Sequence, residues 1–405
     1  MEITGFRFER LTGALDRAPE EFYEQRLAQP LDVYPEFRAR SATDVFVGGG
    51  SEETDTAGAG DAVEVSQVFL HVETDDGVTG LAGPVSAEWA SAIARFEDLL
   101  VGEDPRATER CWDLMYRSAI HGRKGKTVQA MSAVDVALWD AKGKAAGEPV
   151  YRLLGGPCRT ELPAYASMLG FPVDPDSVRE RAAETKERGY GAQKWFFRYG
   201  TGSGHEGKDA NEALVRAARD AVGDDYDLFF DAWSSWNRNF ALDMIDRLAP
   251  YDPDWVEEPV HQDRVETYVE LREAAPFPIA GGEHEYTRMG AHELLSRGAV
   301  DVLQQDTMWA GGFTELDHAA TLASVHDIPL VPHGHLVPAN THLVAANPEP
   351  VCPYVEYLVR WNEQTQLFFA EPVTPEDGTV SPPDDPGIGV ELDYDAADER
   401  ETIEP

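Results

Sequence analysis

The stretch DLFFDAWSSW (Asp227 to Trp236) carries an apolar strand pattern into an aspartate, Asp231. The stretch DWVEEP then reaches Glu257, 26 residues later, and PIAGGEHEY reaches Glu283, another 26 residues on. An interval of this length holds one strand, one helix and their loops. The repeat therefore predicts strand and helix units, each with a carboxylate where its strand ends.

Short apolar strands alternate with helical patterns from about residue 128 to residue 360. We expect the strands at LPAYAS, AQKWFF, YDLFFDA, WVEEP, FPIAGGE, DVLQQD, PLVPHG and YVEYL. Alternating strands and helices form a parallel sheet, and about eight such units predict a closed barrel. The predicted fold class is thus α/β, a modified TIM (β/α) barrel.

Polar residues occur in consistent phase at the carboxyl ends of these strands. They are Lys194, Asp231, Glu257, Glu283, Asp306, His333 and Glu356. All strand carboxyl ends of a barrel surround one mouth, so these side chains are expected to face one cavity.

Three of the converging residues, Asp231, Glu257 and Glu283, are carboxylates. They would repel one another unless protonated or bound to a cation. Three anionic oxygens suit Mg²⁺, and the lack of Cys or His among them argues against zinc. The alternative is that each carboxylate caps a helix or pairs with an arginine. Glu258 competes with Glu257, because strand alternation lets only one of two neighbours face the site.

His333, in VPHGH, and Asp306, in LQQD, form a second predicted group. An aspartate that holds a histidine raises its basicity and orients it for proton transfer. A structural histidine is the alternative, and His335 and His342 lie near enough in sequence to be confused with it. Strand phase favours His333 as the base.

Lys194 is followed two residues later by Phe196, so no second lysine is expected on the side opposite His333. Lys194 is expected to bind an anionic oxygen, and Glu356 to hydrogen-bond the substrate carboxylate. His284 and His205 are candidate substrate ligands, with bystander roles as the alternative. Trp233 is expected to form part of the pocket wall.

Residues 1–127 mix strands and helices and predict an α+β capping domain, followed by a barrel over 128–360 and a C-terminal segment over 361–405. In the first domain, VEVSQVFLHVETDDGVTG predicts a hairpin that turns at DDG, and helices are expected around residues 87–100 and 108–118. In the barrel, DANEALVRAARDAVG predicts a helix over residues 209–223. Within the first domain, residues 38–61 are rich in Gly, Ser, Thr and acidic residues. This loop is predicted either to close over the site as a lid or to be a floppy surface loop. Arg40, in the same loop, is a candidate substrate ligand. One strand is expected in the tail, near Phe368.

The chain has 74 acidic and 34 basic residues, for a formal net charge of −40. This charge argues against nucleic acid and anionic membranes as partners. It fits a solvated acidic surface or, more specifically, a salt-loving host, since the Debye length is only about 3 Å at 1 M salt. Three scattered cysteines argue against a disulfide framework. We expect no signal peptide, no membrane span and a cytoplasmic location.

The residues described above, together with SAVDVALWDAKGKAAGEPVYRLLGG, resemble the enolase superfamily and its mandelate racemase subgroup. LDVYPEFRARS, KWFFRYG, FFDAWSSW, GEHEYTRMG, GGFTE and VPHGH resemble most the acid-sugar dehydratases of the L-rhamnonate dehydratase type. The resemblance implies that the C-terminal tail completes the capping domain and that the cap closes the barrel mouth. It also implies Mg²⁺ on the three carboxylates, an Asp306–His333 base dyad, and Glu356 facing the substrate carboxylate.

The implied activity is Mg²⁺-dependent dehydration of a sugar acid, through an enediolate, to a 2-keto-3-deoxy acid. Phe196 departs from the second lysine of the racemases and makes racemisation less favoured. Two alternatives remain: another reaction of this superfamily, such as epimerisation or cycloisomerisation, and a non-catalytic protein that binds sugar acids. The expected partners are a small sugar acid and further copies of the chain, from a dimer to an octamer.

Overall fold

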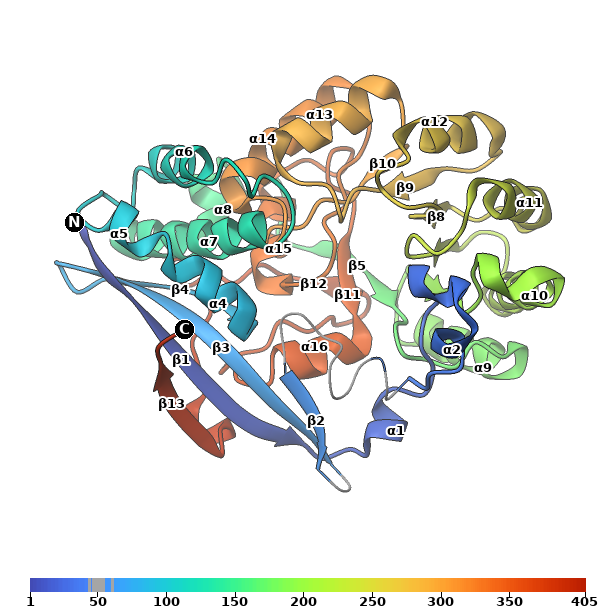
Figure 1. The fold of residues 1–405 in the computed structure, drawn as a ribbon, viewed down its shortest axis with the longest axis horizontal. Coiled ribbons are helices and arrows are strands. Elements are labelled where there is room, and N and C mark those ends of the chain that lie inside the picture. The colour runs from blue at the N-terminus through green and yellow to red at the C-terminus, as the bar shows by residue number, and fades with distance from the viewer. Residues whose placement is uncertain (43–44, 46–54, 60–61) are drawn as a thin grey trace.

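The computed structural model of the protein describes residues 1–42, 45, 55–59 and 62–405. Figure 1 shows an antiparallel sheet with its own helices beside a ring of helices around a parallel sheet. Most of the predicted lid falls outside the described residues. The predicted domain boundaries after residues 127 and 360 stay a prediction.

The antiparallel sheet contains both ends of the chain. Its strands are β1 (Ile3–Leu15), β2 (Asp55–Ala59), β3 (Ala62–Thr74), β4 (Thr79–Val85) and β13 (Glu399–Ile403), in the order β13-β1-β3-β2 with β4 paired to β3. The predicted hairpin turns where expected, at Asp75 to Gly77, where Gly77 has φ 84°. The last strand, in red, lies along the first, in blue (Figure 1). The C-terminal tail therefore completes the capping domain, as predicted.

The tail corrects one prediction. The strand expected near Phe368 is only a single bridge between Phe369 and Leu392. The pairing that ties down the tail is that of β13 with β1, and the short β12 (Thr379–Val380) pairs with the barrel strand β5.

Short helices and one long helix accompany the antiparallel sheet. They are α1 (Pro19–Phe22), η1 (Pro30–Val33), α2 (Pro35–Arg38), α4 (Ala87–Ala94), α5 (Glu97–Leu100), α6 (Thr108–Ser118), α7 (Lys126–Ala146) and α8 (Val150–Leu153). A single helix was expected over residues 87–100, but a turn at Arg95 and Phe96 divides it and leaves Phe96 buried. The long helix α7 shares the core of the capping domain through residues such as Met131, Val134 and Leu138.

The parallel sheet follows the predicted alternation. Its strands are β5 (Leu162–Ser167), β6 (Ala192–Phe196), β7 (Asp227–Asp231), β8 (Trp255–Glu257), β9 (Ile279–Gly281), β10 (Val302–Leu303) and β11 (Val355–Leu358). The helices around it are η2 (Thr201–Ser203), α9 (Pro175–Glu187), α10 (Gly204–Val222), α11 (Arg238–Leu248), η3 (Ala249–Tyr251), α12 (Val265–Ala274), α13 (Thr287–Arg297), α14 (Gly312–Val325), α15 (Val337–Ala346) and α16 (Val359–Thr365), with η4 (Tyr394–Ala396) in the tail. The sheet order β10-β9-β8-β7-β6-β5-β11 confirms a curled (β/α) sheet with a capping domain.

The segment PLVPHG, expected as a strand, closes the gap between β10 and β11 without forming a regular ladder. Leu330 makes one parallel bridge with Leu303, and its N–H donates to the Val351 carbonyl at 2.8 Å. Pro329 and Pro332 flank the bridge, and proline has no N–H to donate to a ladder. The sequence identified the position of this segment but not its irregular pairing.

The barrel interior is filled by one inward residue from each of several strands. These residues are Tyr165, Ala192, Phe229, Trp255, Ala280, Val302 and Val331. The rings of Phe229 and Trp255 stack with centroids 3.4 Å apart. This apolar layer forms a floor beneath the barrel mouth, and side chains that point inward above it face the mouth.

Candidate active site

Several polar residues of the mouth follow a residue of the apolar floor by two positions in sequence. Side chains of a strand alternate between faces, so the residue two positions after an inward one is inward too. This relation links Ala192 to Lys194 and Phe229 to Asp231. The same step separates Trp255 from Glu257, Val302 from Gln304, Val331 from His333 and Tyr354 from Glu356.

Asp231, Glu257 and Glu283 come together as predicted. Each offers a carboxylate oxygen within 4.8 Å of the other two, and each side chain is almost completely buried. Burial and the charge of Glu257 hold the pKa of Asp231 well above its ordinary value. Burial also raises the pKa of Glu283 to about 7, an effect that His333 opposes and Glu258 reinforces. Such crowded anionic oxygens are a hard donor set that a divalent cation would stabilise.

Lys194 joins this cluster from β6. Its Nζ lies 2.5 Å from Glu257, 2.8 Å from Glu356 and 3.4 Å from Asp231. Burial disfavours the ammonium, but Glu257 and Glu356 outweigh that effect and hold the pKa of Lys194 well above its ordinary value. The structure thus places a buried positive charge among the carboxylates, and the binding of a substrate oxygen by Lys194 stays a prediction.

Glu257 and Glu258 have different partners, although Glu258 lies just beyond the end of β8, where strand alternation no longer decides its direction. Glu257 Oε2 accepts hydrogen bonds from Gln304 Nε2 at 2.7 Å and from Trp255 Nε1 at 3.1 Å. Glu258 has φ 39°, beyond the end of β8, and its Oε2 lies 2.7 Å from His284 Nδ1.

Glu258, Glu283 and His284 form a second cluster whose ligand atoms also lie within 4.8 Å of one another. Burial opposes a charged imidazole, but Glu258 outweighs it and raises the pKa of His284 to about 9. Two carboxylates and one imidazole are a softer donor set than three carboxylates, and Mg²⁺ prefers oxygen ligands. The cluster of Asp231, Glu257 and Glu283 is therefore the better Mg²⁺ site.

The dyad of His333 and Asp306 forms on the adjacent wall. His333 Nδ1 lies 3.3 Å from Asp306 Oδ2, and its Nε2 lies 4.0 Å from Glu283. The backbone N–H groups of Met308 and His335 donate to the two oxygens of Asp306, at 2.6 and 3.1 Å. Asp306 is thus held in place, and its contact with Nδ1 turns Nε2 toward the carboxylate cluster.

The electrostatics of the dyad depend on the carboxylates around it. Burial works against the imidazolium, but Glu283 and the hydrogen bond with Asp306 outweigh it and raise the pKa of His333 to about 10. A cation on the carboxylate cluster would offset the Glu283 charge and lower this pKa toward the range in which His333 acts as a base.

Glu356 lies between Lys194 and the loop that carries His333. Its Oε2 accepts a hydrogen bond from the Gly334 N–H at 2.9 Å, and Oε1 contacts Lys194. Burial works against its ionisation, yet Lys194 and His333 hold the pKa of Glu356 below its ordinary value.

A cavity of about 460 Å³ opens above these groups. Its wall combines the charged cluster with apolar and aromatic residues from the barrel and the cap. The lining residues are Leu27, Gln29, Val45, Gly125, Lys126, Gln129, Leu169, Phe196, Asp231, Trp233, Glu283, His284, Tyr286, Trp309, His333, His335, Leu358 and Trp361. This volume suits a small molecule.

The four candidate substrate ligands divide into two pairs. His284 and Trp233 line the cavity, as predicted. Arg40 and His205 are not among the lining residues that the structure describes. Arg40 is exposed, with its guanidinium 4.5 Å from the centroid of the Phe37 ring. His205 is exposed because α10 begins at Gly204, earlier than the sequence indicated, and carries it on the outer surface.

Two lining residues have roles that the sequence did not reveal. Trp309 stacks on His333 with ring centroids 4.5 Å apart and fixes the plane of the imidazole. It follows Asp306 by three residues, a position with no distinctive local pattern. Gln129 reaches the cavity from α7, and nothing in the sequence distinguished it from the other buried polar residues of that helix, Ser132, Asp135 and Asp140.

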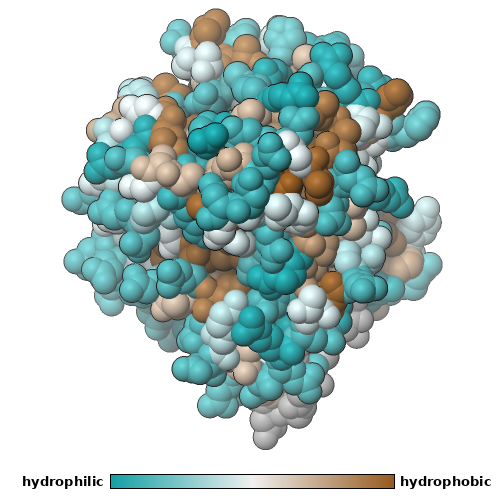
Figure 2. Space-filling view, turned by 90° about the vertical axis from the view of Figure 1, so that its left-hand side faces the viewer, coloured by the Kyte–Doolittle hydropathy of each residue, from teal (hydrophilic) through white to brown (hydrophobic). Residues whose placement is uncertain are grey.

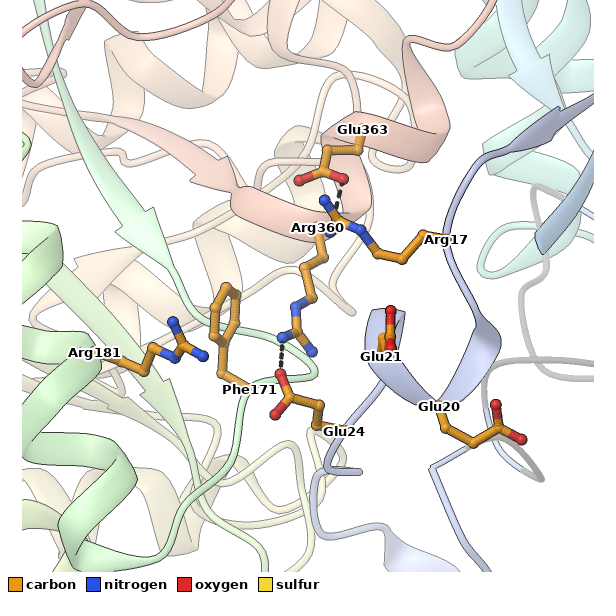
Figure 3. Close-up of a pocket in the computed structure, with 8 residues that line it drawn as sticks. All are labelled: Arg17, Glu20, Glu21, Glu24, Phe171, Arg181, Arg360 and Glu363. Atoms are coloured by element: carbon orange, nitrogen blue, oxygen red, sulfur yellow. Dashed lines mark hydrogen bonds and ion pairs between the residues drawn. The ribbon is translucent and has the colours of Figure 1, made fainter. Parts of the chain in front are cut away.

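A second cavity, of about 540 Å³, lies where the N-terminal segment meets α16 and the loop after β5. Figure 3 shows Arg17 paired with Glu363 and Arg360 paired with Glu24 across it. Arg360 also lies over the Phe171 ring, 3.9 Å from its centroid. These pairs bind the cap to the barrel, and the catalytic candidates lie in the other cavity.

Comparisons with known proteins agree with this architecture. Residues 177–397 match the family model described as enolase C-terminal domain-like, and residues 56–155 match the N-terminal domain of mandelate racemase and muconate lactonizing enzyme. The chain is 34% identical to an L-rhamnonate dehydratase of Saccharopolyspora erythraea, over 93% of this chain and 92% of that protein.

Two further relatives differ in activity. The chain is 34% identical to a D-galactarolactone cycloisomerase of Agrobacterium fabrum, over 84% of this chain and 92% of that protein. A crystal structure of rhamnonate dehydratase from Gibberella zeae complexed with Mg superposes with a TM-score of 0.82 at 27% identity, covering 98% of this chain and 95% of that one.

Proposed function

This chain belongs to the enolase superfamily of enzymes, within its mandelate racemase and muconate lactonizing enzyme group, and we propose that it is an Mg²⁺-dependent dehydratase of a sugar acid. The observation that carries the proposal is the one-sided arrangement of the site. His333 Nε2 faces the carboxylate cluster from one wall, while Phe196, on the cavity wall two residues after Lys194, offers no base.

Asp231, Glu257 and Glu283 would hold the metal. Mg²⁺ would supply a hard positive charge beside the substrate carboxylate, where negative charge grows as the C2 proton leaves. Lys194 is placed to bind an oxygen of the same carboxylate, and Glu356 keeps Lys194 in position. Preorganised charges of this kind account for more of the rate enhancement than proton transfer, which contributes about 10²–10⁴ in rate.

His333 would take the C2 proton on Nε2, which leaves an enediolate. Asp306 holds Nδ1 and stabilises the imidazolium so formed. The C3–O bond then breaks, and Nε2 returns its proton to the departing hydroxyl, which leaves as water. The resulting enol takes a proton from solvent at C3, releases the proton of its C2 hydroxyl to solvent and becomes the 2-keto-3-deoxy acid, with net loss of one water.

The dehydratase relatives in sequence and structure support this assignment. The cycloisomerase relative, equally identical, favours a second candidate: isomerisation of a sugar lactone that begins with the same proton abstraction. Wild-type protein would be incubated with Mg²⁺ and a library of aldonates, aldarates and sugar lactones. Semicarbazide detects a 2-keto product, and mass spectrometry separates loss of water from isomerisation.

The base assignment is tested by substitution. His333→Asn should abolish dehydration and exchange of the C2 proton with solvent deuterium, while the fold and metal binding persist. Asp306→Asn should be milder, because it perturbs the base without removing it. His205→Asn, at an exposed histidine, is the matched control and should retain wild-type activity. Retained C2 exchange in His333→Asn, together with its loss in Lys194→Met, would assign the base to Lys194 instead.

The surroundings in which the enzyme works are a further part of the proposal. The formal charge of −40 supports a salt-rich cytoplasm, where screening weakens self-repulsion. No helix among the described residues is long and apolar enough to span a bilayer. Assembly into a homo-oligomer rests on the family resemblance, and light scattering on the purified protein would test it.

A further inference from the structure

The start of α7 forms a polar wall of the cavity, on the side of the capping domain. Gly125, Lys126 and Gln129 line the cavity there. The helix is 21 residues long, and no side chain caps its first turn. Gly125 enters the helix with φ 66°, a conformation that suits glycine and keeps a side chain out of this position. The N–H groups of a first helical turn point away from the helix and can donate hydrogen bonds to a polar ligand.

Gln129 is a second, independent feature of the same wall. Its side chain is only 5% exposed, and Oε1 has no hydrogen-bond partner among the described residues. The Oε1 atoms of Gln67, Gln304 and Gln305 are also unpartnered. Each of those residues, however, donates its amide nitrogen to a protein acceptor, and none lines the cavity. A buried amide without partners is costly unless a ligand satisfies it.

The chemistry of this wall favours a neutral hydroxyl over a carboxylate. A hydroxyl donates to Gln129 Oε1 and accepts from a nearby N–H, whereas a carboxylate can only accept. The lysines of this segment are already paired: Lys126 with Glu88, and Lys124 with Glu285 at 2.7 Å. The remaining neighbours in the cavity include the apolar side chains of Leu27 and Leu169.

We propose that Gln129 and the first turn of α7 bind a hydroxyl at the end of the substrate chain remote from its carboxylate. The inference rests on the proposed function, because the metal cluster and Lys194 would hold the carboxylate at the barrel mouth, while Gln129 lines the cavity from the capping domain. The subsite makes the enzyme selective for polyhydroxylated monoacids whose chain is long enough to reach α7. It discriminates against shorter acids and against diacids.

The test is a ladder of monoacids that share configuration at every common carbon: D-glycerate, D-erythronate, L-lyxonate and L-mannonate. Calorimetric titration into Mg²⁺-loaded His333→Asn protein gives the dissociation constant of each acid without turnover. At one point in the series, lengthening the acid by one hydroxylated carbon should improve affinity by roughly 2- to 12-fold, the net value of one hydrogen bond. This increase is the affinity step of the series. That step should vanish in the double variant His333→Asn/Gln129→Leu, which keeps the side-chain volume but removes the amide.

Lys142→Met in the same background is the matched control. It removes a charge from the same helix at a residue that does not line the cavity and leaves the Gln129 amide, so the step should persist. Thermal unfolding and Mg²⁺ titration of each variant would show that fold and metal site are intact. L-mannarate, which carries a second carboxylate in place of the terminal hydroxymethyl group, should bind more weakly than L-mannonate.

Three results would overturn the inference: a ladder without a step, a step that survives Gln129→Leu, or tighter binding of L-mannarate than of L-mannonate. The ladder also separates this inference from the proposed function. A step that depends on Gln129, in a protein whose wild type dehydrates none of these acids, supports the subsite and refutes the dehydratase. Absence of binding by every acid would refute both.

Discussion

Replacement of Lys194 by methionine should destabilise the metal-free protein strongly. Its ammonium is 1% exposed and contacts Glu257 at 2.5 Å, Glu356 at 2.8 Å and Asp231 at 3.4 Å. Removal of one partner from a buried ion pair costs about 3–5 kcal/mol, because the other charge is left uncompensated. Methionine preserves most of the volume of the side chain, so the effect should be electrostatic.

The size of the effect can be expressed as a melting temperature. The entropy of unfolding is about 2.1 cal/mol/K per residue, which gives about 0.85 kcal/mol/K for 405 residues. The loss of stability then lowers Tm by about 4–6 °C. Lys208→Met is the matched control, since Lys208 pairs with the half-exposed Asp243. A surface pair contributes about 0.2–1 kcal/mol, so its Tm should fall by about 1 °C or less.

The assay is differential scanning calorimetry with EDTA and then with excess Mg²⁺. A cation among Asp231, Glu257 and Glu283 would replace the charge that Lys194 supplied, so the deficit of the variant should shrink when Mg²⁺ is added. The reasoning fails if Lys194→Met melts with the wild type in EDTA. It also fails if Mg²⁺ leaves the deficit unchanged, because the lysine and the metal would then not share the same carboxylates.

Three further predictions concern metal, salt and pH. Chelation should abolish activity and Mg²⁺ should restore it; full activity after exhaustive chelation would refute the metal site. Asp231→Asn should weaken metal binding by more than about 100-fold, whereas Asp225→Asn, at an exposed position, should leave metal binding unchanged. Tm and activity should rise between about 0.1 and 2 M KCl, because screening relieves self-repulsion, and a flat or falling Tm would contradict adaptation to salt. Burial lowers the pKa of His342 to about 4 from an unfolded value near 6.5, so between these values the unfolded chain binds a proton that the folded chain does not. The free energy of unfolding should therefore be highest above pH 6.5 and fall by up to about 3 kcal/mol toward pH 4. His342→Gln should therefore flatten the plot of Tm against pH between those values, and an unchanged slope would show that His342 is not responsible.

The sequence predicted the positions of the polar residues at the barrel mouth well, because those positions obey a local rule. Period-two alternation and strand ends are visible in the chain itself, so the sequence alone places Asp231 and Glu257 one inward step above Phe229 and Trp255. The strand LPAYAS and the helix from Thr108 to Ser118 occur at the predicted residues for the same reason.

Features that depend on remote contacts have no signal in the local sequence. The family resemblance implied that the tail completes the capping domain, but nothing local identified the pairing of β13 with β1. The polar partner of His284 is Glu258, which lies beyond a strand end with positive φ, where alternation no longer applies. Gln129 looked like one polar residue in an amphipathic helix, and only its position in the folded molecule reveals an amide oxygen in the cavity wall with no partner among the described residues.

The charges of the mouth also imply an order of binding. The carboxylates of Asp231, Glu257, Glu283, Asp306 and Glu356 outnumber the buried cations of Lys194 and His333. Such a cluster repels the carboxylate of a sugar acid, and the strongly acidic chain around it adds to the repulsion. Hydrophilic residues cover most of the face shown in Figure 2, so salt can screen the outer charges. The buried cluster is screened far less, and only a bound cation can compensate it. Substrate affinity should therefore depend on prior metal binding even in high salt, because salt screens the charges on the surface but not the buried carboxylates of the mouth.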